Sequence, residues 1–200
     1  LPDAEINADD FSRLGEDYAA SVHQEGITSE FHTDKMPANY QYIGLLALAL
    51  PRAKFLVMRR HPLDNLLSNY MQHFGRNQPF STDFAHLASV YASFDKAATH
   101  WASALPDRVR EVHYEDVTAD PEGQMREVLD FVGLDWTPDV LDYKSSLRQV
   151  NTASVSQVRE PIYRRAVERW RRYGPALEPM ARELRGFLTA EELAACGVTD

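Results

Sequence analysis

The sequence predicts an α/β fold in which a short parallel sheet is packed between helices. Residues 53–58 form a compact apolar run typical of a buried strand, and shorter strands are expected over 109–114 and 28–33. Segments with helical periodicity separate these strands, and strands that alternate with helices pair in parallel. Three strands are few for such a sheet, since typical sheets have about five or six, so part of the sheet is expected to be missing.

Two helices are expected in the N-terminal part. The first covers residues 8–22, with Asp9 or Asp10 as its N-cap. Its predicted apolar face consists of Phe11, Leu14, Tyr18 and Val22. The second, residues 39–50, is largely apolar, so we expect it to be mostly buried. It should stop near Pro51, because the residue before a proline avoids the α conformation.

Helix signals continue after the strand 53–58. Pro62 suits the first position of a helix, and the apolar period that follows extends to residue 74. Another long helix is expected over 81–105. Asp120 and Pro121 start a further helix that Gly133 ends. Beyond it, residues 145–161 are polar without a period, and amphipathic helices are expected over 163–173 and 176–188.

Composition excludes several classes of protein. The net charge of −9 argues against a dedicated nucleic-acid binder. The longest apolar stretch, residues 43–50, is too short for a membrane span, and the acidic first residues do not resemble a signal peptide. The one cysteine, Cys196, cannot form an internal disulfide, and no Cys/His cluster has metal-site spacing. We therefore expect one domain over residues 1–200, without metal, in a cytoplasm-like compartment.

Charge is unevenly distributed along the chain. Residues 1–34 carry nine acidic residues and one basic residue, whereas residues 159–172 carry six arginines and two glutamates. A second basic cluster consists of Arg52, Lys54, Arg59 and Arg60. These clusters are compatible with a small polyanionic ligand and equally with solvated helix faces, and charge alone leaves both interpretations open.

The end of the strand 53–58 is the most informative position. Ligands of open α/β sheets bind beyond the carboxyl ends of strands. Here the strand ends in Arg59 and Arg60, directly before a helix N-terminus, where a phosphate would meet guanidinium groups and the helix dipole. Ser68 follows eight residues after Arg60 and lies off the apolar face. The helical pattern alone favours reading it as an exposed surface serine.

Residues 54–74 resemble the 3′-phosphate-binding segment of sulfotransferases that use 3′-phosphoadenosine-5′-phosphosulfate (PAPS). In that family a strand-end arginine and a serine eight residues later bind the 3′-phosphate, and these positions correspond to Arg60 and Ser68. Further segments resemble the family in the same order, namely residues 9–22, 33–40, 112–134 and 148–173. The resemblance is strongest to bacterial sulfotransferases with tetratricopeptide repeats and to tyrosylprotein sulfotransferases.

The resemblance implies roles for other residues. Lys35 would stabilise negative charge at the sulfuryl group, and Tyr114 would contact the adenosine half of PAPS. The loop that closes over the nucleotide would contribute Ser154, Arg164, Arg165 and Arg169. Glu168 stands where relatives often carry a small residue. Without the resemblance, Lys35 reads as a surface lysine and Tyr114 as a packing residue at a strand end.

One part of the family pattern is absent. Members begin the domain with a strand and a Gly-Ser/Thr loop whose amides hold the 5′-phosphosulfate. None of the nine glycines here precedes Ser, Thr or Lys. The resemblance therefore implies a three-layer α/β/α P-loop-like sulfotransferase fold without its N-terminal strand and phosphate loop. The missing strand would expose a sheet edge and favour self-association. The general base stays unassigned; His32 is the histidine nearest to Lys35 in sequence.

The expected reaction is sulfuryl transfer from PAPS to a hydroxyl or phenol of a small molecule or protein, with the isolated chain inactive. The sequence does not identify the acceptor. A kinase of related fold would need a Walker A lysine and Mg²⁺ ligands, and neither is recognisable. A non-catalytic domain that binds an adenosine phosphate or a protein partner is compatible with the missing loop.

Overall fold

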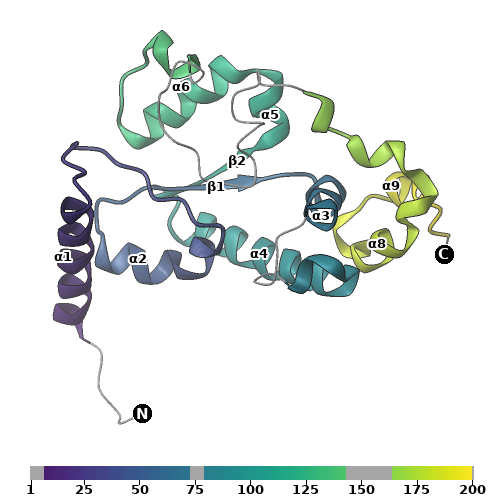
Figure 1. The fold of residues 1–200 in the computed structure, drawn as a ribbon, viewed down its shortest axis with the longest axis horizontal. Helices are drawn as coiled ribbons and strands as arrows, with labels where there is room; N and C mark the ends of the chain where they lie inside the picture. The colour runs from purple at the N-terminus through teal and green to yellow at the C-terminus, as the bar shows by residue number, and fades with distance from the viewer. Residues whose placement is uncertain (1–6, 73–78, 143–163, 200) are drawn as a thin grey trace. The chain divides into compact units, whose positions relative to one another are not determined.

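The computed structural model describes residues 7–72, 79–142 and 164–199 (Figure 1). The chain is rich in helices and contains a short parallel sheet of two strands, β1 (Phe55–Arg59) and β2 (Val109–His113). It forms two compact units. The first unit comprises Leu1–Val57 and Lys96–Arg110, and the second unit comprises Met58–Asp95 and Glu111–Asp200. The α/β class is thus supported, whereas the single domain and the P-loop-like layers stay predictions.

The first unit begins with α1 (Ala8–Gln24), which confirms the first expected helix. Its N-cap is Asn7 and not Asp9 or Asp10, so that part of the prediction was wrong. The Asn7 side chain accepts hydrogen bonds from the amides of Asp9 and Asp10, and the Asp10 carboxylate accepts from the Asn7 amide at 3.0 Å. This reciprocal capping box satisfies three backbone donors and leaves Asp9 and Asp10 within the first turn of the helix.

Helix α1 packs against α2 (Ile43–Ala49) through a glycine that the predicted apolar face did not include. Gly15 is buried, and a Cβ built on it would lie only 2.0 Å from the carbonyl oxygen of Ala49. Leu14, which was expected on this face, is 42% exposed. Close approach of the two backbones therefore turns the buried face of α1 toward Gly15.

The strand expected over 28–33 was wrong. These residues are all exposed and adopt no regular structure, and the one sheet of the described residues pairs β1 with β2 and does not include them. The helix expected over 39–50 is divided into the 3₁₀ helix η1 (Pro37–Tyr42) and α2, and it ends before Pro51 as predicted. It is only partly buried, since Leu45 and Leu48 are exposed.

The hydrophobic core of the second unit lies between α3 (Pro62–Met71), α4 (Phe84–Ala104) and the C-terminal elements. A 3₁₀ turn, η3 (Pro79–Thr82), precedes α4. The core side chains are Leu63, Leu66, Leu67, Leu87, Ala88, Tyr91, Trp170, Leu177, Met180, Ala181, Leu184, Cys196 and Val198. Segments distant in sequence therefore meet around α3, the helix that follows β1.

Helices α5 (Tyr114–Ala119) and α6 (Pro121–Val132) follow β2, and η4 (Pro138–Leu141) comes after them. The α6 boundaries confirm the capping prediction. The Asp120 side chain accepts a hydrogen bond from the Gly123 amide at 3.0 Å, and Gly133 ends the helix with a left-handed φ of 80°. Helix α5 was not predicted.

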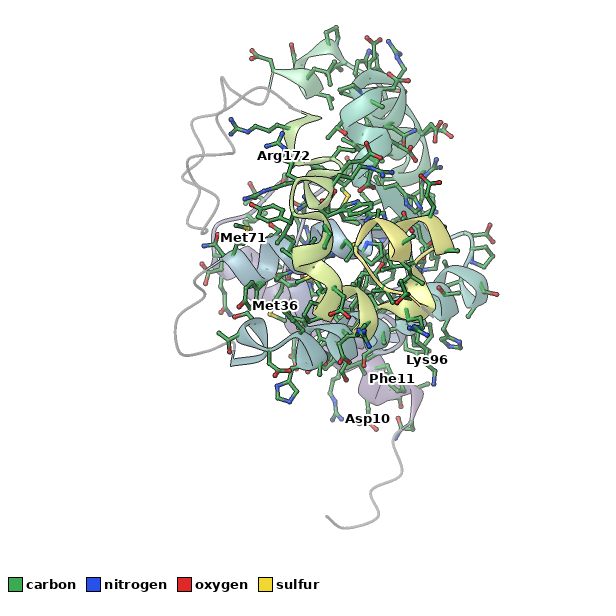
Figure 2. All side chains as sticks on the ribbon, turned by 90° about the vertical axis from the view of Figure 1, so that its right-hand side faces the viewer. Asp10, Phe11, Met36, Met71, Lys96 and Arg172 are labelled. Atoms are coloured by element: carbon green, nitrogen blue, oxygen red, sulfur yellow. The ribbon has the colours of Figure 1, made fainter. Side chains whose placement is uncertain are left out.

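The C-terminal part differs most from expectation. Short turns of helix, namely η5 (Arg164–Ala166), η6 (Arg169–Arg172), η7 (Gly174–Leu177), α8 (Glu178–Glu183) and η8 (Arg185–Phe187), replace the two expected amphipathic helices. Left-handed residues at Glu168 and Gly174 interrupt the helical path. The chain ends with α9 (Ala190–Ala195), which carries a Thr189–Glu192 capping box; these elements are yellow-green to yellow in Figure 2.

Within the described ranges, no helix combines the length and hydropathy needed to cross a membrane.

Candidate functional site

The junction between β1 and α3 in the second unit contains Arg59 and Arg60, the two arginines at the end of the predicted strand. Pro62 occupies the first turn of α3, as predicted, and His61 is its N-cap residue. The His61 amide donates a hydrogen bond to Glu115 Oε1 at 2.9 Å, which joins the start of α3 to the start of α5. Arg59 and Arg60 immediately precede this cap, but the fold gives them different surroundings.

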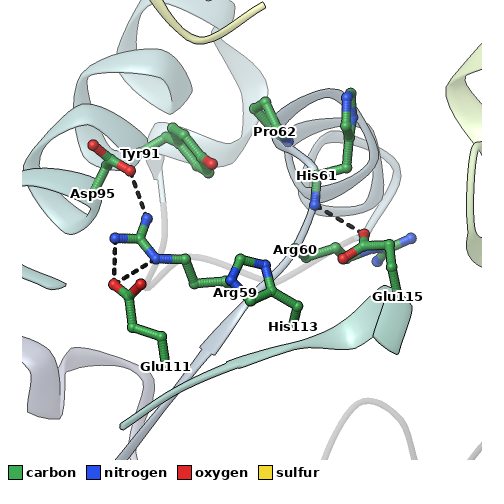
Figure 3. A pocket seen from close by; sticks show the side chains of 9 residues that line it. All are labelled: Arg59, Arg60, His61, Pro62, Tyr91, Asp95, Glu111, His113 and Glu115. Carbon is green, nitrogen blue, oxygen red and sulfur yellow. Dashed lines mark hydrogen bonds and ion pairs between the residues drawn. The ribbon is translucent and has the colours of Figure 1, made fainter. Parts of the chain in front are cut away.

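Arg59 is neutralised by two carboxylates. Its Nη1 lies 2.5 Å from Asp95 Oδ1, and its Nε donates to Glu111 Oε1 at 2.7 Å (Figure 3). Burial opposes its charge, but the hydrogen bonds with Glu111 and Asp95 outweigh burial and raise the pKa of Arg59. Because N–H groups on two edges of its guanidinium bind these carboxylates, Arg59 links β1 to β2 and α4. Arg59, which was not among the predicted site residues, is therefore occupied by these ion pairs.

Arg60 keeps its positive charge available. Its guanidinium lies over the Tyr114 ring, 5.0 Å from the centroid, and Nη2 donates to the Ala166 carbonyl at 2.7 Å. Its Nε is buried without a hydrogen-bond partner, and Arg60 has no carboxylate ion pair within the described ranges. Arginine carries five N–H donors, so donors remain for an anion. The structure therefore brings Arg60 and Tyr114, two of the predicted site residues, into contact.

Ser68 lies on α3 and is half-buried. It shares a face with Asp64 one turn before it and with Met71 one turn after it. Arg169 Nη2 lies 3.3 Å from the sulfur of Met71, a residue that is half exposed (Figure 2). The α3 face that carries Ser68 is therefore flanked by Arg169, a third predicted residue.

The remaining predicted residues are Arg164, Arg165, Ser154 and Lys35. Arg165 is exposed and precedes Ala166, the acceptor for Arg60. Arg164 begins η5, but its side chain lies outside the described part of the chain, as do Ser154 and the irregular segment 145–161. Lys35 belongs to the first unit, where it is exposed between a segment without regular structure and η1.

The segment around Lys35 is tethered within the first unit. Tyr18 of α1 donates a hydrogen bond to Asp34 Oδ2 at 3.1 Å, directly before Lys35. Burial and the Asp34 carboxylate raise the pKa of Tyr18, so the phenol stays protonated and continues to donate. His32 lies near the same tyrosine, with ring centroids 6.2 Å apart.

A hollow of about 460 Å³ opens where β1 and β2 end (Figure 3). It is lined by Arg59, Arg60, His61, Pro62, Tyr91, Asp95, Glu111, His113 and Glu115. Three of these residues are acidic and Arg59 already neutralises two of them, so the hollow itself is not a cradle for an anion. Among the described residues, Arg60 has no carboxylate ion pair, in contrast to Arg59.

Sequence reasoning missed several residues of the junction. Asp64 is 1% exposed and its Oδ1 accepts the Trp170 amide at 2.9 Å, while the His61 ring stacks on Trp170 and meets Glu192. The available signal was an acidic residue between Leu63 and Leu66 on the predicted apolar face. An acidic residue in the first turn of a helix is usually explained by its favourable interaction with the helix dipole, so the pattern gave no reason to expect that Asp64 is buried.

The model of the sulfotransferase family matches residues 2–138, more than half of the chain. The chain belongs to the sulfotransferase family. The match includes Lys35, Arg60, Ser68 and Tyr114, whereas the C-terminal arginines lie beyond it. An uncharacterized protein of Aquifex aeolicus (strain VF5) is 37% identical over 163 residues, which are 80% of this chain and 21% of that protein. The chain thus spans about a fifth of that relative's length.

Family membership confirms the coarser part of the prediction, that the chain belongs to a sulfotransferase family. The predicted closeness to repeat-bearing and tyrosylprotein sulfotransferases stays a prediction. No group of three or more potential metal ligands occurs in the described part of the chain.

Proposed function

We propose that this chain is part of the catalytic domain of a PAPS-dependent sulfotransferase and that its second unit binds the adenosine 3′,5′-bisphosphate part of the donor. The observation that carries the proposal is Arg60, a guanidinium without a carboxylate partner among the described residues, with a buried free Nε and a face resting on Tyr114. A planar guanidinium with free N–H groups is suited to bidentate binding of phosphate.

Each predicted residue has a role in this proposal. Arg60 and Ser68 bind the 3′-phosphate, and Tyr114 supports the adenosine half. The closing contacts come from Arg169 and Arg165, together with Arg164 and Ser154. Lys35 stabilises charge at the sulfuryl group. PAPS supplies an activated sulfuryl group, and no metal is required. The acceptor is a hydroxyl or phenol on a small molecule or a protein, as expected for a tyrosylprotein sulfotransferase-like enzyme.

The proposed P-loop-like fold needs a phosphate loop, which the 200-residue sequence does not contain. We therefore expect the isolated chain to bind the bisphosphate weakly and to transfer no sulfuryl group. Removing one backbone donor of such a site lowers rates by about 10²–10³-fold. Radiolabelled PAPS with a panel of phenols and peptides measures this, and clear turnover by the isolated chain would contradict it. The absent loop is also compatible with a second candidate, a non-catalytic binding domain. That candidate predicts binding without turnover even in the longer protein.

Two further features fit the proposal. A single, buried cysteine is compatible with a reducing compartment such as the cytoplasm. In the first unit Leu45, Leu48 and Leu56 are 41–59% exposed, which supports a tendency to self-associate.

Calorimetric titration with adenosine 3′,5′-bisphosphate tests the Arg60 assignment. Arg60→Ala removes a charge-assisted contact of about 1.5–3 kcal/mol, so we expect affinity to fall by roughly 10- to 150-fold. Arg185→Ala, which removes an exposed arginine elsewhere in the second unit, is the matched control and leaves affinity unchanged. Equal affinity of the wild type and Arg60→Ala would refute the site, and a preference for ATP with Mg²⁺ would favour a kinase.

A further inference from the structure

Asp64 is the least expected side chain of the second unit. It lies in the first turn of α3, is 1% exposed, and is surrounded in sequence by the core residues Leu63, Leu66 and Leu67. Burying a carboxylate is unfavourable unless its oxygens are well paired. Here Oδ1 accepts the Trp170 amide, but Oδ2 is buried without a hydrogen-bond partner.

The pKa of Asp64 reflects this position. Burial raises it above the ordinary value of 3.8, and the Trp170 amide and the charges of Arg60 and His61 only partly oppose the rise. Keeping the Asp64 carboxyl group buried, away from water, therefore costs the folded protein free energy. A core position that needed only stability would be better filled by an apolar residue of similar size. We therefore expect Asp64 to position neighbouring groups rather than to stabilise the fold.

The contact that Asp64 makes lies next to the contact that holds Arg60. Asp64 fixes Trp170 through its amide, and Arg60 donates to the carbonyl of Ala166, four residues earlier. Between these two anchors the chain turns at Glu168, which has a left-handed φ of 54°. The position of the Ala166 carbonyl consequently depends on where Trp170 is held.

His61 reinforces the Trp170 anchor from its other side. Its ring is stacked on the indole, with centroids 5.6 Å apart and planes 10° apart, and its Nε2 lies 2.8 Å from Glu192 Oε1. Arg169, the neighbour of Trp170, approaches Met71 on the Ser68 face of α3. One anchored segment, residues 166–170, therefore sets the direction of Arg60 and carries Arg169.

We infer that Asp64 is a positioning residue for the adenosine-phosphate site: by holding the Trp170 amide it fixes residues 166–170, and through the Ala166 carbonyl it orients the Arg60 guanidinium toward a 3′-phosphate. The inference rests on the proposed function. It also assigns a role in donor binding to the C-terminal segment, which lies beyond the residues matched by the family model.

The test compares two ligands on the 200-residue chain, adenosine 3′,5′-bisphosphate and adenosine 5′-monophosphate, which lacks the 3′-phosphate. The ratio of the two affinities measures the contribution of the 3′-phosphate, and so how well the Arg60 guanidinium is oriented toward it. We expect Asp64→Ala to reduce this ratio by about tenfold or more, because a charge-assisted contact is lost when the guanidinium turns away. Asp64→Asn keeps an acceptor oxygen for the Trp170 amide and should preserve the ratio within about threefold.

A double-mutant cycle separates positioning from general destabilisation. If Asp64 acts through Arg60, the Arg60→Ala/Asp64→Ala protein has the same ratio as Arg60→Ala alone. A purely structural Asp64 lowers the melting temperature and leaves the ratio of the folded protein unchanged, which would overturn the inference. Additive losses in the double mutant, or a collapsed ratio in Asp64→Asn, would also overturn it.

The outcomes distinguish this inference from the proposed function. A wild-type chain that binds neither ligand, or whose ratio is insensitive to Arg60→Ala, refutes the proposed function. A ratio sensitive to Arg60→Ala but not to Asp64→Ala refutes only the role of Asp64. If Asp64→Ala does not fold, Asp64→Ser replaces it, because the serine hydroxyl is too short to reach the Trp170 amide. The affinity ratio of Asp64→Asn is then compared with that of Asp64→Ser.

Discussion

His61 Nε2 lies 2.8 Å from Glu192 Oε1, so the N-cap residue of α3 is tied to α9, more than a hundred residues later in the chain. The other oxygen of Glu192 accepts hydrogen bonds from the amide and hydroxyl of Thr189, which start α9. The Glu192 carboxylate therefore caps α9 and also binds α9 to His61 at the junction between β1 and α3. Because both of its oxygens are used, the charge state of Glu192 should affect the stability of the second unit.

We expect this contribution to be lost in acid. Burial raises the pKa of Glu192, but the hydrogen bonds from Thr189 and His61 outweigh burial, and the net pKa lies below the ordinary value of 4.5. An acid with a lowered pKa stabilises the fold above its unfolded pKa and loses that effect as the pH falls through the folded pKa. Glu192→Gln should cost about 1 kcal/mol at pH 7 and less below pH 4.5. Urea unfolding at several pH values measures this, and parallel pH profiles for the two proteins would contradict it.

Glu168 should prefer replacement by glycine over alanine. Both changes remove its ion pair with Arg171, but only glycine adopts a φ of 54° without a steric penalty. We expect Glu168→Gly to be more stable than Glu168→Ala by about 1 kcal/mol. Comparing the two unfolding midpoints in urea isolates the backbone effect, and equal midpoints would show that residue 168 is not left-handed in solution.

Arg59 and Arg60 should respond differently to substitution. Arg59→Met leaves Asp95 and Glu111 without their shared partner, and we expect a loss of about 1–3 kcal/mol of stability. The affinity of the folded protein for adenosine 3′,5′-bisphosphate should stay within about threefold, in contrast to Arg60→Ala. Adding Glu111→Gln should recover part of the stability. An affinity loss as large as that of Arg60→Ala would mean that Arg59 also contacts the ligand.

Gly15 should not tolerate alanine although it lies within a helix. Alanine normally stabilises a helix by about 1 kcal/mol relative to glycine. At Gly15, however, the new Cβ would lie 2.0 Å from the Ala49 carbonyl oxygen, so α1 and α2 must separate. We expect Gly15→Ala to destabilise the protein by about 1–3 kcal/mol. Gly186→Ala is the control, because nothing lies within 4 Å of its Cβ position, and thermal melts of the two variants should differ clearly.

Local chemistry was enough to predict the elements with strong end signals. Asp120, Pro121 and Gly133 determine where α6 starts and ends, because their side chains and backbone preferences act within one helical turn. Pro62 marks the start of α3 in the same way. The expected strand at 28–33 failed, since a strand exists only with a partner and the sequence does not say whether one is near.

The sequence by itself determined that Arg60 follows a buried strand, precedes a helix and lies eight residues before Ser68, since covalent order and hydrophobic period are local properties. Charge and position alone did not separate Arg60 from Arg59, and the predicted choice of Arg60 came from the family resemblance. Tertiary structure adds the partners of each arginine: Arg59 meets Asp95 and Glu111, whereas Arg60 meets Tyr114 and the Ala166 carbonyl. Only packing between distant segments brings such partners together, so the available charge of the site was decided by the fold.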